Sequence, residues 1–429
     1  MIYSSPWEFK KLEEMIIFNP EENILPGDAV KLINMNELKP GHKHISDFVS
    51  AEYMGKGRKF RNGDVLVPQI SSALAAGKTA LVSLLDKDEI GVGSNWFIVL
   101  RSIDGISSPD FLYYLAITPW FRELALKARE GATQSQYVNI NILKEIALPF
   151  PPYEEQCLIA DTLSLIDEKI KKNSEVFDAA EKILAELFYI WFIEFNFPDK
   201  EGKPYASNGG KFIGSELGLI PRGWKTGRLS DVGDIAAGAT PSKKIDKYYS
   251  DKGIPWITPR DLSNQGTKFV SRGEVDITWE GHKSCSVVTM PAGTVLFSSR
   301  APIGYMAIAD NELTTSQGFR SVIPHKGVGS NFVYYLLRSK TQDITNIASG
   351  SIFKEISGQA LKDFEIIIPD ALVLKAFEEQ TEHISRYQRN LEKENRLLTL
   401  IRKNLLPVLM TGIKRIPARG LNKWMQPKN

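Results

Sequence analysis

The longest regular pattern of apolar residues lies near the middle of the chain. Between Glu154 and Phe197, apolar residues recur at alternating intervals of three and four. This spacing places one apolar stripe along a helix and is typical of a coiled-coil seam. Such a helix would be roughly 66 Å long at 1.5 Å per residue. The seam positions are Ile159, Leu163, Ile166, Ile170, Asn173, Phe177, Ala180, Leu184, Leu187 and Trp191.

A second seam of the same kind lies near the end of the chain. The central polar residue of each seam is Asn173 or Glu394, and these two lie 221 positions apart. Because each seam runs for several heptads, we expect the two helices to pair, although packing of each helix on its own domain is the alternative. Pro407 should kink or end the second helix. The second seam contains Phe377, Gln380, Ile384, Tyr387, Leu391, Glu394, Leu398, Ile401, Leu405 and Val408.

A stretch of short apolar segments precedes each seam. These segments are rich in β-branched residues and are bounded by Gly, Asn and Pro, so they predict strands. The predicted strands are 63–68, 80–85 and 96–100, and later 254–258, 294–297, 305–309 and 364–368. Helical spacing follows at 109–129 and at 330–345. Each stretch therefore predicts a compact α+β domain.

The two halves of the chain repeat each other. The segment F-L-Y-Y-L at 111–115 returns as F-V-Y-Y-L at 332–336, and G-D-V-L at 63–66 returns as G-T-V-L at 293–296. Such a long repeat indicates a tandem duplication of a whole domain, and two like domains should be related by a pseudo-twofold axis. Each helix follows its domain, so the paired helices should be antiparallel. Asn173 and Glu394 could then meet and fix the register.

This organisation divides the chain into five parts. We expect a first domain over 1–150, a long helix over 151–197, a linker and second domain over 198–370, a second long helix over 371–412, and a basic tail over 413–429.

Composition narrows the class of protein only a little. The chain is 43% apolar and 24% charged, its net charge is +2, and it has no apolar run long enough to cross a membrane. We expect a folded cytoplasmic protein. Cys157 and Cys285 are too few for a disulfide framework, and the five His residues show no ligand spacing, so we expect neither a metal nor another cofactor.

Three segments resemble catalytic motifs and fail on their chemistry. Phe150-Pro151-Pro152-Tyr153 lacks the Asn or Asp with which an amino-methyltransferase loop holds its target amine. Residues 72–79 lack the first glycine of a phosphate-binding loop. The charged residues of 198–203 lie in a turn, whereas nuclease carboxylates converge from separate strands. We therefore expect no catalytic residue in this chain.

Basic and small polar residues gather on the predicted loops of both domains. Lys and Arg neutralise phosphates, and Gln, Asn and Arg can read base edges, so the matching clusters favour DNA over the alternative of solvated loops. The candidates are Lys56, Arg58, Lys59, Arg61, Ser71, Ser72, Lys78, Gln134, Gln136, Tyr137, Lys243, Lys244, Lys247, Tyr248, Arg260, Ser299, Arg300, Gln317, Arg320, Ser351 and Lys354.

Together these features resemble the specificity subunits of type I restriction-modification systems. The resemblance rests on G-x-V-L-[VF] in both copies, on Gly238-Ala239-Thr240-Pro241-Ser242 followed by 254–257, and on P-P-x-E-E-Q before the first long helix. The chain departs from the pattern in two places. Six extra residues separate Pro369-Asp370 from Glu378-Glu379-Gln380, and the first copy has no clear G-x-T-P-S segment.

The resemblance implies a non-catalytic subunit with two target-recognition domains. Each domain would read one half of a split, asymmetric target in double-stranded DNA, and the helix pair would set the unread spacer. The implied partners are two adenine-N6 methyltransferase subunits, which would pack on the helix pair, and restriction-translocase subunits that join through them. The alternative is a recognition or scaffold protein of another DNA-modification or defence system. A self-sufficient DNA enzyme and a structural protein that ignores sequence are further rivals.

Overall fold

The computed structural model describes residues 7–130, 136–300, 302–350 and 354–416. The chain divides into two compact units, which we call the first and the second unit. The first comprises Met1–Lys172 with Arg396–Asn429, and the second comprises Asn173–Asn395. Each unit thus combines a globular part with a segment of both long helices.

The globular part of the first unit is built from two four-stranded sheets. Their strand orders are β2-β9-β6-β7 and β4-β3-β8-β5, and a separate ladder joins β1 to β12. The elements are β1 Glu8–Lys11, α1 Leu12–Met15, β2 Ile16–Phe18, β3 Ala29–Ile33, β4 Val49–Glu52, β5 Arg58–Phe60, β6 Val65–Pro68, α2 Ser71–Ala75, β7 Ala80–Leu81, β8 Gly91–Gly93, β9 Phe97–Ser102, α3 Pro109–Ile117, α4 Pro119–Lys127, β10 Arg129–Glu130, β11 Tyr137–Val138, α5 Ile140–Lys144 and β12 Ala147–Phe150.

The second unit has one five-stranded sheet, in the order β16-β24-β21-β22-β19, with shorter ladders around it. Its elements are β13 Phe212–Ser215, β14 Gly218–Pro221, β15 Lys225–Arg228, η1 Leu229–Asp231, β16 Gly233–Ala237, η2 Asp246–Tyr248, β17 Tyr249–Ser250, β18 Trp256–Ile257, α7 Pro259–Gln265, β19 Phe269–Val270, β20 Asp276–Ile277, α8 Trp279–Lys283, β21 Val295–Ser299, β22 Ile303–Ala309, β23 Thr314–Thr315, β24 Arg320–Pro324, α9 Ser330–Ile347, α10 Gly358–Lys362 and β25 Glu365–Ile368.

The strand registers show that the two units have the same topology. In the first unit, Val65 of β6 pairs with Leu100 on one side and Leu81 on the other. In the second, Val295 of β21 pairs with Val322 and Ile308 in the same way. The order β2-β9-β6-β7 therefore matches β16-β24-β21-β22, and the ladder of β1 with β12 matches that of β15 with β25. This agreement confirms the internal duplication.

The repeated aromatic segment forms the centre of each core. Phe111 and Tyr114 on α3 are buried, as are Phe332 and Tyr335 on α9. Burying a large aromatic ring stabilises a core strongly, which explains why this segment has kept its pattern. The single helix expected over 109–129 is divided into two. Thr118 has extended backbone, so α3 ends at Ile117 and α4 begins at Pro119. The cause is Pro119, which disfavours helical backbone at the preceding residue.

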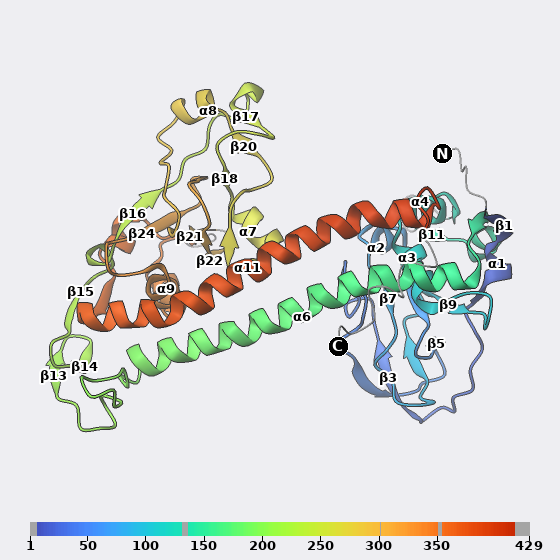
Figure 1. The fold of residues 1–429 in the computed structure, drawn as a ribbon, viewed down its shortest axis with the longest axis horizontal. Coiled ribbons are helices and arrows are strands. Elements are labelled where there is room, and N and C mark those ends of the chain that lie inside the picture. Colours follow the sequence, from blue (N-terminus) through green and yellow to red (C-terminus); the bar gives the residue numbers. More distant parts are fainter. Residues whose placement is uncertain (1–6, 131–135, 301, 351–353, 417–429) are drawn as a thin grey trace, which may run out of the picture. The chain divides into compact units, whose positions relative to one another are not determined.

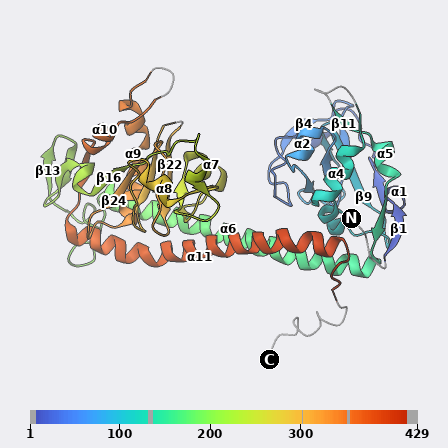
Figure 2. The same cartoon turned by 90° about the horizontal axis from the view of Figure 1, so that it is seen from above.

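The two long helices are α6, Tyr153–Phe192, and α11, Ala371–Met410, each of 40 residues. They run side by side in Figures 1 and 2, α6 in green and α11 in red. In the first unit Asp167 contacts Arg402, whereas the earlier Glu155 contacts the later Arg415. In the second unit Asn173 contacts Glu394, and α6 reaches Gln388 eight residues later, at Glu181. The helices are antiparallel in both units, as expected.

The helix ends differ from the prediction. α6 ends at Phe192, five residues before Phe197, and α11 continues through Pro407 for three more residues. The six extra residues before Glu378 are not an added linker, because α11 already begins at Ala371.

The predicted seam holds for α6 but only in part for α11. All ten seam positions of α6 are buried or half-buried. On α11, Gln380 is exposed, as are Tyr387 and Ile401 with 53% and 42% of their surface accessible. The buried residues of this part of α11 are Leu374, Phe377, Thr381, Ser385, Gln388, Leu391 and Glu392, of which only Phe377 and Leu391 are predicted seam positions. Most of these residues are polar, so apolar spacing identified only part of the buried face.

Candidate nucleic-acid interface

Two of the four basic candidates around β5 are held by Glu22 of the same unit, one by its carboxylate and one by its backbone carbonyl. The Arg61 guanidinium donates two hydrogen bonds to Glu22 at 2.7 and 2.8 Å, and Lys59 donates to the Glu22 carbonyl at 2.6 Å. Burial alone would raise the pKa of Glu22, but hydrogen bonds from Arg61 and Arg101 lower it overall. Lys56 is exposed in the loop before β5, and Arg58 is half-buried on that strand. Lys56 and Arg58 therefore remain the better phosphate-binding candidates.

The polar candidates of the first unit lie at the end of β6. The Ser71 amide at the start of α2 donates to the Gln136 carbonyl at 3.1 Å, and Ile70 bridges to Tyr137. Ser72 is exposed on the same helix. Lys78 donates to the Met35 carbonyl at 2.9 Å, which reduces its availability for a phosphate. Gln134 lies outside the described residues.

In the second unit, three candidates line one cavity of about 220 Å³. Lys243 comes from the loop after β16, Arg300 from the end of β21 and Gln317 from the turn before β24. The other residues of the wall are Thr240, Trp256, Thr258, Pro259, Ser316 and Gly318. Lys243 and Arg300 can bind a phosphate here and the Gln317 carboxamide can read a base edge, although Arg300 also pairs with Glu355 at 3.5 Å. The G-A-T-P-S segment at 238–242 thus contributes directly to this wall.

The remaining candidates of the second unit are more dispersed. Lys244 and Arg260 are exposed, whereas Lys247 pairs with Glu280 at 2.9 Å and Lys354 donates to the Thr345 carbonyl at 3.2 Å. Tyr248 is half-buried in η2, the Ser299 side chain is buried, and Arg320 donates to the Phe319 carbonyl at 2.8 Å. Ser351 lies outside the described residues.

Sequence reasoning missed two residues of the first unit. Asn95 and Trp96 are both exposed on the turn between β8 and β9, and the Trp96 ring lies 6.5 Å from that of Tyr137. The available signal was S-N-W-F at 94–97, which matches S-Q-G-F at 316–319. Their loops carry no basic cluster, so a search for basic residues did not find them.

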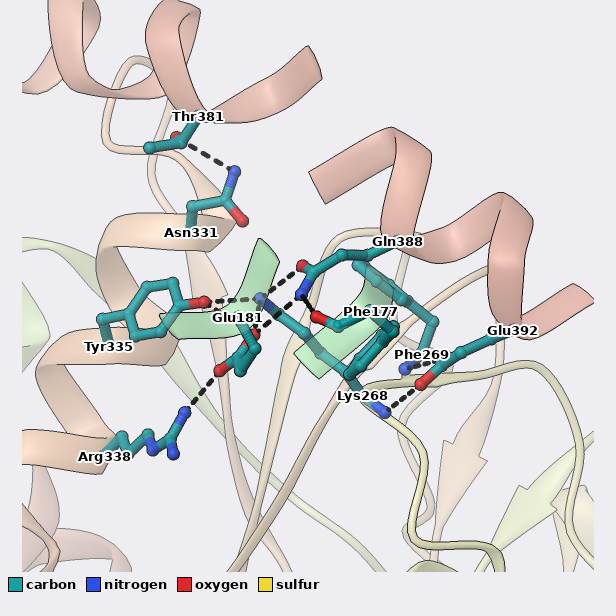
Figure 3. Close-up of polar contacts among 10 residues, drawn as sticks. All are labelled: Phe177, Glu181, Lys268, Phe269, Asn331, Tyr335, Arg338, Thr381, Gln388 and Glu392. Atoms are coloured by element: carbon teal, nitrogen blue, oxygen red, sulfur yellow. Dashed lines mark hydrogen bonds and ion pairs between the residues drawn. The ribbon is translucent and has the colours of Figure 1, made fainter. Parts of the chain in front are cut away.

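A buried polar cluster joins the segment before β19 of the second unit to both long helices (Figure 3). The Lys268 ammonium, just before β19, donates to Tyr335 of α9 at 2.7 Å and to Gln388 of α11 at 3.0 Å. It also pairs with Glu181 of α6 at 2.8 Å. Tyr335 donates to Glu181 at 2.8 Å, and Arg338 is a further cation for that carboxylate. Four separate elements therefore meet at one ion pair.

Burial and charge act in opposite directions on the pKa values of this cluster. Only 4% of the Lys268 surface is exposed, and burial lowers the pKa of its ammonium. Burial alone would raise the pKa of Glu181, but Lys268 lowers it overall by its charge and hydrogen bond. The cluster thus holds a charged pair inside the unit, with Arg338 beside it. These contacts fix the segment before β19 against α6, α9 and α11.

The first unit has a corresponding cluster. The Lys43 ammonium lies 4.9 Å from the Tyr114 ring centre, as that of Lys268 lies 4.7 Å from the ring centre of Tyr335. Lys43 donates to Ser164 at 2.6 Å, and Tyr114 donates to Asp167 at 2.7 Å. The duplication has therefore kept a lysine over the second tyrosine of each Y-Y pair.

Asn173 and Glu394 meet as the two seams predicted. The Asn173 amide donates to Glu394 at 2.8 Å and to Asn395 at 2.9 Å, and Asn395 donates to Ser174 at 3.2 Å. Asn173 is buried, so a shift of the helices would leave its amide without these acceptors. The pair therefore favours one register.

The segments that resembled catalytic motifs have structural roles. Phe150 is a buried strand residue whose ring lies 5.4 Å from that of Phe111. Asp199 accepts backbone hydrogen bonds from Glu201 and Lys203 within a turn. Over the described ranges, no three His, Cys, Asp or Glu side chains gather in a way that could hold a metal ion. No described helix is long and apolar enough to cross a membrane.

The chain is similar to proteins of one family. A family model described as the type I restriction modification DNA specificity domain matches residues 4–176 and 221–403. The specificity subunit of the type I restriction enzyme MjaIX of Methanocaldococcus jannaschii is 44% identical over 192 residues, which span 43% of this chain and 44% of that relative. The HindI specificity subunit of Haemophilus influenzae is 25% identical over 454 residues, which span 92% and 95%.

A solved structure shares the fold. The S subunit of a type I restriction-modification system from M. genitalium matches with a TM-score of 0.59 and 15% sequence identity. The match covers 95% of this chain and 96% of that one.

Proposed function

The chain belongs to the type I restriction modification DNA specificity family, and on this premise we propose how it recognises DNA. Each unit reads one half of a split, asymmetric double-stranded target, and the helix pair sets the distance between the halves. The observation that carries the proposal is the pair of units with one topology and different exposed side chains. A shared frame suits two similar half-sites, and different side chains make their sequences differ.

Exposed cations support DNA as the ligand. Lys56 in the first unit and Lys243, Lys244 and Arg260 in the second are exposed and have no ion-pair or hydrogen-bond partner for their side chains among the described residues. Such groups bind phosphates and release counterions, so affinity should fall as salt rises. Because the net charge is only +2, the attraction to phosphates depends on local clusters of cations rather than on the charge of the whole chain.

We propose that the helix pair also binds two adenine-N6 methyltransferase subunits, through which restriction-translocase subunits join. Five large apolar side chains of the two helices are each more than 40% exposed. They are Leu397, Leu400 and Ile401 of α11 and Leu165 and Ile183 of α6. Large apolar side chains in water favour a protein partner. In this arrangement the chain itself performs no catalysis and needs no cofactor.

Co-expression with the methyltransferase encoded beside it tests the proposal. N6-methyladenine mapped in the host DNA should lie in a two-part sequence with a fixed gap. Methylation in a single uninterrupted sequence, or in no defined sequence, would contradict the proposed division of labour. Methyl transfer from S-adenosylmethionine to DNA by the purified chain alone would contradict its non-catalytic role.

A further inference from the structure

The two units present the same tight turn at the same point of the fold. Residues 94–97 follow β8 and lead into β9, and residues 316–319 follow β23 and lead into β24. In each turn the amide of the final phenylalanine donates to the carbonyl of the first serine, at 3.1 Å for Phe97 and 3.2 Å for Phe319. Both phenylalanine rings are fully buried, so each turn is anchored in its core.

Further backbone hydrogen bonds fix the two turns to equivalent strands. The strand before each turn pairs in parallel with a strand that ends in isoleucine, β3 in one unit and β18 in the other. A backbone amide at the end of the central strand, Gln69 just after β6 or Ser299 at the end of β21, also donates to the third residue of the turn. These contacts are Ser94 N to Ile33 O at 3.2 Å and Gln69 N to Trp96 O at 2.7 Å, and correspondingly Ser316 N to Ile257 O at 2.8 Å and Ser299 N to Gly318 O at 2.8 Å.

The second residue of each turn carries a carboxamide, Asn95 in one unit and Gln317 in the other. Both residues are exposed. Asparagine in a turn commonly bonds to its own local backbone. Within the described part of the chain, however, neither carboxamide makes a hydrogen bond. Each amide is thus available to a ligand, while the backbone that carries it is held rigidly.

The surroundings of the two carboxamides differ. Beside Asn95 stands Trp96, half of whose surface is exposed, whereas beside Gln317 stands Gly318. A Cβ atom at Gly318 would lie 3.0 Å from Pro259, so this position cannot hold a tryptophan without rearrangement. The glycine leaves room for the cavity that Lys243 and Arg300 line. An exposed indole ring therefore follows the carboxamide in the first unit, whereas in the second the carboxamide lines a cavity with Lys243 and Arg300.

We propose that Asn95 and Gln317 are equivalent specificity-determining residues, each of which reads one adenine in its own half of the target. A carboxamide is both donor and acceptor, and it matches the N7 acceptor and N6 donor that adenine shows in the major groove. The rigid turn holds the amide at a fixed position, as direct readout requires. The proposal rests on the proposed function, because it assumes that each unit binds one half-site.

The test uses the chain assembled with its co-expressed methyltransferase. The variants Asn95→Ala and Gln317→Ala are compared with Asn141→Ala on α5 and Gln342→Ala on α9, which remove exposed amides elsewhere in the same units. Asn95→Asp and Gln317→Glu keep the side-chain length and remove the donor. Methylated sequences are mapped in the host, and affinity is measured on duplexes that carry each base substitution in turn.

Each variant should relax one adenine position in one half only. Discrimination at that position should fall roughly ten- to hundred-fold, with the other half unchanged and the two control variants like the wild type. The acidic variants should lose adenine preference and gain tolerance for cytosine, whose N4 amine needs an acceptor. An unchanged motif, relaxation of the same half by both variants, or an equal loss of affinity for every sequence would overturn the proposal. If the wild type yields no two-part motif, the proposed function itself fails.

Discussion

The most specific prediction concerns Glu378, whose carboxyl group lies at the start of α9 but is largely removed from water. Its Oε1 atom accepts from the Asn331 backbone amide at 3.2 Å, at the start of α9. Its Oε2 atom is buried and has no hydrogen-bond partner among the described residues. Gly329 gives it room, since a Cβ there would lie 2.2 Å from the carboxyl carbon. Burial raises the pKa of Glu378 from 4.5 to about 7.

In the first unit a neutral glutamine side chain takes the place that the Glu378 carboxyl has in the second. There the Gln156 side chain accepts from the Ser108 amide at the start of α3 at 3.0 Å and donates to the Ile106 and Pro151 carbonyls, both at 2.9 Å. We therefore expect Glu378→Gln to stabilise the protein.

The sign of the pH dependence follows from the raised pKa. The folded protein keeps the Glu378 proton above pH 4.5, where the unfolded chain has lost it, so ionisation opposes folding as pH rises toward 7. A tenfold difference in proton affinity corresponds to about 1.4 kcal/mol, which gives on the order of 1 kcal/mol near pH 5 and about 3 kcal/mol near pH 7.5. The gain from Glu378→Gln should thus grow by about 2 kcal/mol over this range.

Denaturant unfolding of the full chain at both pH values measures this gain. Glu379→Gln is the matched control, because that side chain is exposed and its nearest cation, Lys375, is 3.7 Å away. The control should change the free energy of unfolding by less than about 0.5 kcal/mol. A gain from Glu378→Gln that is equal at both pH values, or a loss of stability at pH 7.5, would refute the reasoning.

Two further predictions concern the helices. Lys268→Met should destabilise the protein by about 2 kcal/mol in denaturant unfolding, because the half-buried Glu181 loses its ammonium partner and keeps only the exposed Arg338 as a cation. Adding Glu181→Gln should restore part of the loss, and Lys354→Met should have little effect. A Lys268→Met variant as stable as the wild type would contradict the role of the ion pair. Asn173→Ala should lower the free energy of unfolding by about 1 kcal/mol, because the interhelical hydrogen bonds are lost. Val176→Ala, at an exposed position of the same helix, should lower it by less than about 0.5 kcal/mol. Equal effects of the two variants would argue against a register role for Asn173.

The long-range organisation of the chain could be predicted from the sequence because that organisation is repeated in the two halves. The α6 seam, the contact of Asn173 with Glu394 and the buried aromatic segments all follow from periodicity and from matching residues in the two halves. The first half of α11 could not be assigned in the same way. Its buried face carries Thr381, Ser385 and Gln388, whose burial depends on hydrogen-bond partners far away in the sequence rather than on apolar spacing.

Candidate DNA contacts were harder to predict for a related reason. Arg61 and Lys59 form a basic cluster in the sequence, yet Glu22, almost forty residues earlier, holds both. Only the folded chain shows which cations already have a carboxylate or carbonyl partner. The opposite holds for Asn95, which has no basic neighbour in its own turn and becomes a candidate through its structural match with Gln317.

Exchange of one recognition domain tests the central claim most directly. Residues 1–150 would be replaced by the corresponding domain of another family member, and the hybrid would be co-expressed with the methyltransferase. Mapping of N6-methyladenine should show one half of the two-part sequence changed, with the other half and the gap retained. A change in both halves would contradict the account that each unit reads its own half of the target.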